Sequence, residues 1–404
     1  MTLRIVPSRL RGTVKAPPSK SMAHRLLIAA ALADGESRIS GIASSEDISA
    51  TVDCLRAMGA EISVTAEVAT VRGFRPQASV GERVLPCRES GSTLRFLLPL
   101  CLLSDAPARL IGSERLLSRP LSVYEEIAAR EGQVFCRDGA SVTVKGRLAG
   151  GEYAVRGDVS SQFVTGLLYA LPFTEKGGVI RLLPPVESRS YLDLTVDALT
   201  AFGVACLWAD PLTLTVPHVE AFTPTDATVE GDYSNAAFFE ALALLGHDVG
   251  VTGLSADSHQ GDRVFFDCFK ALATGCPTLS LADCPDLGPI LMALAAALGG
   301  AVFTDTARLA IKESDRGAAM AEELRKFGAE VTLASNTITV RGGGLRPPTA
   351  PLCGHNDHRI VMSLATLATV YGAVIEGAEA VKKSLPEYFE MLTRLGAEVH
   401  YEAN

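Results

Sequence analysis

The sequence predicts an α/β protein with two domains, each built of three βαβαββ units. Its length of 404 residues is too great for one simple core and suits two domains. A pattern of an apolar helix, a short strand, an amphipathic helix and a glycine recurs six times along the chain. With 48% hydrophobic and 21% charged residues, the composition is that of a well-packed globular protein.

Each unit begins with a polar cluster that continues as an apolar helix of about a dozen residues. These helices are expected to begin near Ser21, Ser92, Ser161, Ser234, Leu287 and Asp357. The intervals between these positions are 71, 69, 73, 53 and 70 residues, so the fourth unit should be trimmed. A strand-like run follows each helix, such as SRISGI in the first unit and AVFTDT in the fifth.

The second helix of each unit is amphipathic, stops at a glycine and turns into a strand. The six glycines are Gly59, Gly132, Gly203, Gly275, Gly328 and Gly396. We expect each of them to supply the left-handed conformation that ends a helix at little cost.

One unit cannot bury both of its helices alone, so the units should pack together, three to a domain. We place the first domain at residues 1–15 and 232–404 and the second at residues 16–231. The chain would then cross between the domains twice. A solenoid of six units is the competing arrangement, because periodicity alone does not distinguish the two.

The composition argues against several classes of protein. A net charge of −9 disfavours nucleic acid or an acidic membrane as the main partner. The most apolar stretch, roughly residues 290–303, is shorter than the ~18 residues that a membrane span needs. Nine cysteines, an odd number without a CxxC pair, fit reduced thiols. Since no apolar signal segment is seen either, we expect a cytoplasmic protein.

Charged and hydroxyl residues gather at the starts of the first helices. Ser, Thr and Asp at such positions are typical helix caps, but capping does not require Lys20, Arg25 or Arg359. Cations at a helix amino terminus oppose the helix dipole, so we expect something negative beside these residues. The free N–H groups of helix amino termini are also anion sites.

Further cations precede the second helices of several units. Lys312 and Arg316 belong to the run KESDR, Arg119 takes the equivalent place in the second unit, and Lys383 precedes the last helix. Together these residues predict an electropositive site on an acidic protein. Such a site suits phosphate and carboxylate ligands.

Signatures of cofactors and metals are weak in this chain. No P-loop is present, and the Gly342–Gly344 run lacks the spacing of a dinucleotide fingerprint. Cys353, His355 and His358 could indicate zinc, but no second cluster completes four ligands. We therefore expect neither a cofactor nor a metal.

Several motifs, in the same order along the chain, resemble those of the 5-enolpyruvylshikimate-3-phosphate synthase family. They are PSKS at 18–21, SSQF at 160–163, SRSY at 188–191, KESDR at 312–316 and NDHR at 356–359. The resemblance implies the enolpyruvyl transferase fold, an inside-out α/β barrel of two domains with three βαβαββ units each. It places the active site in the cleft between the domains.

The resemblance also implies a reaction without a cofactor, in the biosynthesis of aromatic amino acids. The 5-hydroxyl of shikimate 3-phosphate adds to C2 of phosphoenolpyruvate while C3 gains a proton. The tetrahedral adduct then loses phosphate and leaves the enolpyruvyl ether. Such a reaction needs acid–base groups with tuned pKa values, and it needs fixed cations that hold two phosphates and a carboxylate.

Individual roles follow from the positions that match the family. The implied proton-transferring, catalytic residues are Lys20, Asp286, Glu313 and His358. The residues implied to bind shikimate 3-phosphate are Ser21, Arg25, Ser160, Ser161, Ser188, Tyr191 and Lys312. Those implied around the phosphate of phosphoenolpyruvate are Gly91, Arg119, Gln162 and Lys383. Arg316 and Arg359 match two carboxylate clamps, for which a planar fork of donors is apt.

Two other functions are weighed against this one. An enolpyruvyl transferase acting on UDP-N-acetylglucosamine typically has a Lys-Asn pair near its start and a reactive cysteine near Arg119. Here the pair is Lys20-Ser21, and residues 112–120 contain no cysteine. A non-catalytic repeat scaffold, for instance a clamp on nucleic acid, would need a basic face. We expect instead a monomeric enzyme whose partners are its two small substrates.

Overall fold

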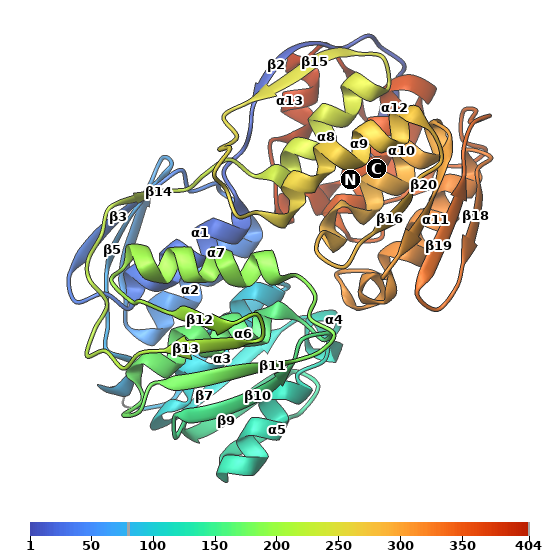
Figure 1. Cartoon of the computed structure of the whole chain (residues 1–404). Helices are drawn as coiled ribbons and strands as arrows, with labels where there is room; N and C mark the ends of the chain where they lie inside the picture. Colours follow the sequence, from blue (N-terminus) through green and yellow to red (C-terminus); the bar gives the residue numbers. More distant parts are fainter. Residues whose placement is uncertain (79–80, 403–404) are drawn as a thin grey trace. The chain divides into compact units, whose positions relative to one another are not determined.

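The structure, a computed structural model, describes residues 1–78 and 81–402 (Figure 1). The chain divides into two compact units. Unit 1 comprises Met1–Pro17 and Gly231–Asn404, and unit 2 comprises Pro18–Glu230. Both units combine helices with several small sheets, which confirms the predicted α/β class.

Unit 2 contains the first three repeats. Its helices are α1 (Lys20–Ala31), α2 (Glu46–Met58), α3 (Gly91–Cys101), α4 (Glu114–Ser118), α5 (Ser122–Glu131), α6 (Ser161–Ala170) and α7 (Arg189–Ala201), with 3-10 turns η1 (Pro76–Ala78) and η2 (Leu171–Phe173). Its strands are β3 (Glu36–Ser40), β4 (Glu61–Thr65), β5 (Val68–Arg72), β6 (Arg83–Arg88), β7 (Leu103–Gly112), β8 (Val134–Arg137), β9 (Ser141–Arg147), β10 (Gly151–Arg156), β11 (Gly178–Leu183), β12 (Leu207–Asp210), β13 (Thr213–Val216) and β14 (Ala227–Thr228).

Unit 1 contains the last three repeats and the amino-terminal strands. Its helices are α8 (Tyr233–Leu244), α9 (Phe265–Thr274), α10 (Gly288–Ala297), α11 (Arg316–Lys326), α12 (His358–Tyr371) and α13 (Tyr388–Arg394), with 3-10 turns η3 (Gly261–Val264), η4 (Pro285–Leu287), η5 (Ala307–Ile311) and η6 (Ala378–Lys383). Its strands are β1 (Thr2–Val6), β2 (Arg11–Lys15), β15 (Asp248–Thr252), β16 (Thr278–Ser280), β17 (Gly300–Thr304), β18 (Glu330–Leu333), β19 (Thr337–Arg341), β20 (Leu352–Cys353), β21 (Ala373–Glu376) and β22 (Glu398–Glu402).

One sheet topology recurs in five of the repeats. The strand orders are β14-β3-β5-β4, β6-β7-β9-β8, β10-β11-β13-β12, β16-β17-β19-β18 and β20-β21-β1-β22. In each sheet the first two strands are parallel and the other pairs are antiparallel. This is the topology of a βαβαββ unit, as the sequence predicted.

The fourth repeat is trimmed. Within the described residues its sheet has two parallel strands, β15 and β2, and no closing hairpin precedes β16 of the fifth repeat. Two other strands come from distant parts of the chain. β14 serves as the first strand of the first repeat, and β1 lies between β21 and β22 in the sixth.

Each unit has its own hydrophobic core around the first helices of its repeats. In unit 1, α8, α10 and α12 contact one another. Helix α10 is apolar on all sides, as expected for a helix that is buried over nearly its whole length. In unit 2, α3 packs against α6, and α1 packs against α7. Two separate cores exclude the single solenoid. None of the helices within residues 1–78 and 81–402 combines the length and apolar character required to span a bilayer.

The glycines that end the second helices behave as expected at five of six positions. Gly59 and Gly132 cap their helices with φ of 118° and 67°. Gly203, Gly328 and Gly396 follow the last turn with φ of 83°, 91° and 101°. The prediction is wrong at Gly275, whose φ of 170° is extended backbone. The reason is the trimmed fourth repeat, because α9 runs on into β16 without a hairpin.

Candidate active site

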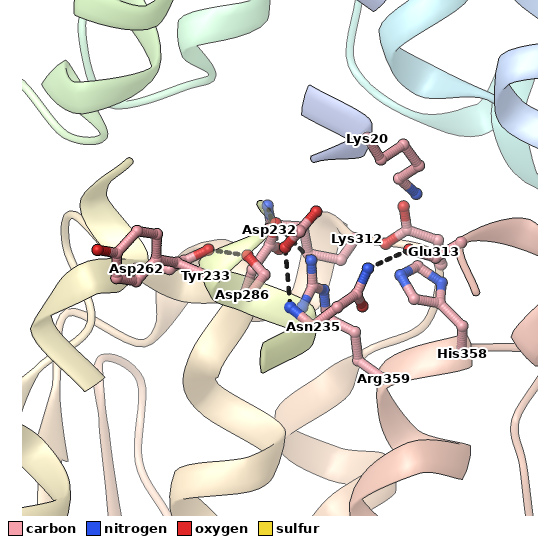
Figure 2. Close-up of polar contacts among 12 residues, drawn as sticks. Lys20, Asp232, Tyr233, Asn235, Asp262, Asp286, Lys312, Glu313, His358 and Arg359 are labelled. Carbon is pink, nitrogen blue, oxygen red and sulfur yellow. Dashed lines mark hydrogen bonds and ion pairs between the residues drawn. The ribbon is translucent and has the colours of Figure 1, made fainter. Parts of the chain in front are cut away.

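In unit 1, the carboxylate of Asp286 is the meeting point of three cations. Arg316 Nη1 lies 2.7 Å from Asp286 Oδ1, and Lys312 Nζ lies 3.2 Å from the same oxygen. Arg359 Nη2 lies 3.4 Å from Oδ2 (Figure 2). Burial opposes ionisation of Asp286, but Arg359, Lys312 and Arg316 together hold its pKa well below its ordinary value. Asp286 is therefore a carboxylate at neutral pH.

Arg316, the first residue of α11, is the most buried of the three cations around Asp286, with 1% of its side chain exposed. Besides Asp286 it contacts Glu313 Oε2 at 2.8 Å and Asp357 Oδ2 at 2.9 Å. Burial works against its charge, but the three carboxylates raise its pKa above the ordinary arginine value. We call Asp286, Lys312, Glu313, Arg316, Asp357 and Arg359 the cation–carboxylate network.

Asp357 links the network to helix α12. Its Oδ1 accepts the backbone N–H of Arg359 at 2.9 Å as the helix cap, and its Oδ2 accepts the hydroxyl of Ser314 at 3.0 Å. Burial acts against ionisation, but Arg316 lowers the pKa of Asp357. His358, the first residue of α12, is buried with its Nδ1 3.9 Å from Asp357 Oδ1.

Lys383, at the end of η6, reaches the turn before α12. Its Nζ donates to the carbonyl oxygen of Asn356 at 2.6 Å. The ammonium group of Lys383 therefore lies close to the residues that begin α12. The residue as a whole is buried. The structure thus brings together, in unit 1, Asp286, Lys312, Glu313, Arg316 and Arg359, with His358 and Lys383 attached through Asp357 and Asn356.

Asp262, next to this network on η3, was not expected from the sequence. It is buried and accepts a hydrogen bond from the hydroxyl of Ser234. Burial and the nearby charge of Asp286 raise the pKa of Asp262 to about 6, although Arg359 opposes the shift. Its motif, Gly-Asp before an amphipathic helix, carries no signal that distinguishes it from a surface turn.

In unit 2, Lys20 begins helix α1, which Ser19 caps by accepting the N–H of Met22. Lys20 Nζ forms an ion pair of 2.7 Å with Asp47 Oδ2 in the first turn of α2. The negative group expected beside this cation is therefore a carboxylate of the chain itself. Sequence reasoning missed Asp47, which reads there as an ordinary acidic residue favoured by the helix dipole.

Arg25 ties α1 to α7 and is almost fully buried. It donates to the carbonyl oxygens of Ser21 at 2.7 Å and Tyr191 at 2.9 Å, and to Thr195 Oγ1 at 2.9 Å. Its guanidinium also lies 5.1 Å from the ring centroid of Phe96. Burial lowers its pKa to about 10. These partners within the chain are uncharged, so the negative group expected beside Arg25 stays a prediction about a ligand.

Gly91 and Arg119 lie together at the start of α3. A Cβ atom on Gly91 would stand 2.6 Å from Arg119 Nη1 and 3.0 Å from its Cζ. Only a residue without a side chain lets the buried guanidinium of Arg119 rest against the helix amino terminus. A cation and free N–H groups at one place favour an anion.

Gln162 belongs to a second polar chain on α3 and α6. Its Oε1 accepts from Arg95 Nη1 at 2.7 Å, and its Nε2 donates to Ser92 Oγ at 3.0 Å. Arg95 Nη2 also donates to the carbonyl oxygen of Pro120 at 3.0 Å, beside Arg119. Arg95 lies in an apolar helical run and gave no functional signal in the sequence.

Ser160, Ser161 and Ser188, three of the predicted ligands of shikimate 3-phosphate, lie at helix starts in unit 2. Ser160 caps α6 by accepting the N–H of Gln162 at 3.3 Å, and Ser161 is the first residue of that helix. Ser188, at the N-cap position of α7, is fully buried and left-handed with φ 56°. A non-glycine residue in that region is strained, which is typical of functional sites.

Comparisons with known proteins agree with these motifs. Residues 6–392 match the family model described as EPSP synthase (3-phosphoshikimate 1-carboxyvinyltransferase). A 3-phosphoshikimate 1-carboxyvinyltransferase of Clostridium kluyveri is 37% identical, over 98% of this chain and 97% of that protein. One of Clostridium perfringens is 35% identical, over 97% of each.

Solved structures share the fold. An EPSP synthase from Acinetobacter baumannii aligns over 100% of both chains with a TM-score of 0.80 and 22% identity. The enolpyruvyl transferase NikO from Streptomyces tendae covers 99% of this chain and 98% of its own, with a TM-score of 0.76 and 20% identity. From the family match and the relatives together, the chain belongs to the EPSP synthase family, the 3-phosphoshikimate 1-carboxyvinyltransferases of the shikimate pathway.

Proposed function

We propose that this chain transfers the enolpyruvyl group of phosphoenolpyruvate to the 5-hydroxyl of shikimate 3-phosphate and releases phosphate. The observation that carries the proposal is the partly buried carboxylate of Asp286 among Lys312, Arg316 and Arg359. Cations and a carboxylate in such contact suit a reaction that must hold anions and move a proton. The named relatives at 35% to 37% identity support the same activity.

Asp286 is the proposed base for the 5-hydroxyl proton. Three cations make it a weak base in the described structure, because they favour its ionised form. Substrate phosphate or carboxylate groups that bind Lys312 and Arg359 would draw positive charge away from Asp286. Its pKa would then rise toward the range that favours proton transfer.

Lys20, Glu313 and His358 are the proposed carriers of the other protons. One of them must protonate C3 of phosphoenolpyruvate as the 5-oxygen bonds to C2. A proton must leave C3 again when the C2–O bond to phosphate breaks.

Lys312 is not assigned to proton transfer. We assign this residue to binding of the shikimate phosphate, and burial lowers its pKa to about 8.

The remaining residues are proposed to bind substrate. Ser21, Arg25, Ser160, Ser161, Ser188 and Tyr191 are assigned to shikimate 3-phosphate, and Gly91, Arg119, Gln162 and Lys383 to the phosphate of phosphoenolpyruvate. Arg316 and Arg359 are assigned to the carboxylate of phosphoenolpyruvate, and Arg316 also pairs with Asp357 within the network. These residues divide between the two units, so we propose that one substrate pair is bound by residues of both domains.

The decisive experiment measures phosphate release from phosphoenolpyruvate plus shikimate 3-phosphate, with a chelator present. Release that requires both substrates and survives chelation supports the assigned reaction and a metal-independent enzyme. A folded protein that releases no phosphate from this pair, but does so with UDP-N-acetylglucosamine, would refute the assignment. Gel filtration of the same preparation tests the proposal that the enzyme is a monomer.

A further inference from the structure

Glu323, on α11, has a fully buried carboxylate that lies outside the cation–carboxylate network. Lys326 Nζ is 2.8 Å from its Oε2 and 3.0 Å from its Oε1. The backbone N–H of Cys353 in β20 donates to Oε2 at 2.9 Å, and His355 Nε2 lies 2.9 Å from Oε1. One carboxylate thus joins α11 to the chain segment that leads into α12.

That segment has an unusual backbone. His355 and Asn356 are both left-handed, with φ of 49° and 51°, although neither is glycine. Consecutive left-handed residues are costly and persist where their surroundings fix them. At Gly354 a Cβ would lie 2.6 Å from Val361 Cγ2 and 2.8 Å from the carbonyl oxygen of Gly377. The turn at residues 354–356 therefore packs tightly against α12 and η6.

The turn carries groups of the candidate active site. The carbonyl oxygen of Asn356 accepts the ammonium of Lys383 at 2.6 Å. Asp357, the next residue, caps α12 and bonds to Arg316. Any change in the turn would move the partner of Lys383 and the first turn of α12, which carries His358 and Arg359.

We propose that Glu323 and His355 are positioning residues, which hold the 354–356 turn so that Lys383 and Arg359 can bind phosphoenolpyruvate. This inference rests on the proposed function. Helix α11 then holds the start of α12 at two points, through Arg316 to Asp357 and through Glu323 to His355.

Electrostatics favour a charged pair. The hydrogen bond to Glu323 raises the pKa of His355, although burial opposes this. Burial works against ionisation of Glu323, but hydrogen bonds from His355, Lys326 and the N–H of Cys353 lower its pKa. Glu322 and Lys326 on α11 also face His355.

A divalent cation is a less suitable occupant of this cluster. Ligand atoms of Glu322, Glu323 and His355 lie within 4.8 Å of one another. However, Lys326 and the N–H of Cys353 already donate hydrogen bonds to the Glu323 carboxylate. A metal would therefore have to displace the ammonium group of Lys326. The geometry therefore assigns the cluster to positioning.

The test compares Glu323→Gln and His355→Gln with Glu322→Gln, an exposed neighbour on the same helix turn. We expect the first two variants to raise the KM for phosphoenolpyruvate about five- to tenfold. A change of this size corresponds to the loss of one hydrogen bond between charged groups. The Kd for shikimate 3-phosphate should change less than about twofold, because all of its assigned ligands except Lys312 lie in unit 2. The double variant should be little worse than either single one, since both remove the same contact. A purely structural role would lower the melting temperature without this split.

Hydrogen–deuterium exchange of residues 352–362 gives a readout that does not depend on activity. Faster exchange there in His355→Gln and Glu323→Gln, but not in Glu322→Gln, supports positioning. Wild-type exchange in both variants would overturn the proposal, and so would an unchanged KM. If wild type itself releases no phosphate, the proposed function fails while the exchange result still decides the structural link. His355→Gln replaces a partly exposed side chain, so it serves if Glu323→Gln does not fold.

Discussion

Arg316 Nη1 lies 2.7 Å from Asp286 Oδ1, so the proposed base, Asp286, forms an ion pair with a guanidinium that is almost wholly buried. Arg316 cannot easily move away from Asp286, because its Nη2 and Nε atoms form ion pairs with Glu313 and Asp357. Lys312 and Arg359 contact the same carboxylate at the longer distances of 3.2 Å and 3.4 Å. Lys312 and Arg359 therefore hold the Asp286 carboxylate less closely than Arg316 does.

Asp286→Asn should lower the rate of phosphate release by at least about 100-fold, because an amide cannot accept the hydroxyl proton. The protein should remain folded, since Arg316 keeps Glu313 and Asp357 as partners. Initial rates at saturating substrates measure the effect, and circular dichroism checks the fold. Asp283→Asn, at an exposed position of the same loop, is the matched control. Retention of more than a tenth of the wild-type rate would remove Asp286 from the catalytic set.

Lys20→Ala should abolish nearly all turnover and leave the melting temperature close to that of wild type. Its ion pair with Asp47 is partly exposed, and such pairs add little to stability. A cation at the first residue of α1 also opposes the helix dipole. Rates and thermal melts of Lys20→Ala are compared with Lys145→Ala, an exposed lysine of β9. Substantial residual activity would show that Lys20 is not required for proton transfer.

Asp262→Asn should make the protein more stable above pH 6. The folded pKa of about 6 exceeds the ordinary aspartate value of 3.8, so the unfolded chain loses this proton first. Raising the pH from about 4 to 6 therefore destabilises the folded state, by on the order of 3 kcal/mol. An amide removes this cost and still accepts from Ser234.

Melting temperatures of Asp262→Asn from pH 4 to 8 check this sign. The gain over wild type should be largest above pH 6 and shrink toward pH 4. Asp267→Asn, an exposed neighbour on α9, should show no such trend. A variant that is less stable than wild type at pH 7 would mean that Arg359 needs the ionised carboxylate of Asp262.

Gly91→Ala should raise the KM for phosphoenolpyruvate at least about tenfold, because small displacements of a binding group are costly. The new methyl group would stand 2.6 Å from Arg119 Nη1, and the flexible guanidinium would have to move. The fold should persist, since Gly91 has no left-handed φ. Gly250→Ala, where a Cβ meets nothing within 4 Å, is the control. An unchanged KM would argue that Arg119 does not bind this substrate.

The sequence predicted the fold well where the signal is local. The apolar helices α1, α3, α6, α8, α10 and α12 begin within a residue or so of the predicted starts, because caps and periodicity are properties of neighbouring residues. The short fourth interval predicted a trimmed unit, and the sheet of that unit has two strands. The prediction of a left-handed conformation was wrong at Gly275, because that conformation depends on the missing hairpin. The residues around Gly275 give no sign that the hairpin is missing.

The candidate site was predicted less completely, because ion pairs join residues far apart in the chain. The cations Lys20 and Arg359 stood out in the sequence, but their partners Asp47 and Asp286 lie 27 and 73 residues away. Asp286 was found only through resemblance to the family. Asp262 has no local signature, since its raised pKa arises from burial and from neighbours that only the folded chain supplies.

Strand β1 has a consequence for how the molecule is made. It pairs with β21 on one side and β22 on the other, so its partners are synthesised after the whole of unit 2. Unit 2, whose residues are contiguous, can fold on the ribosome while the amino-terminal strands still wait. Unit 1 can complete its sixth sheet only after residues 373–402 have been synthesised. During that interval residues 2–6 lack their strand partners, and an unpaired strand edge is a site at which chains can aggregate.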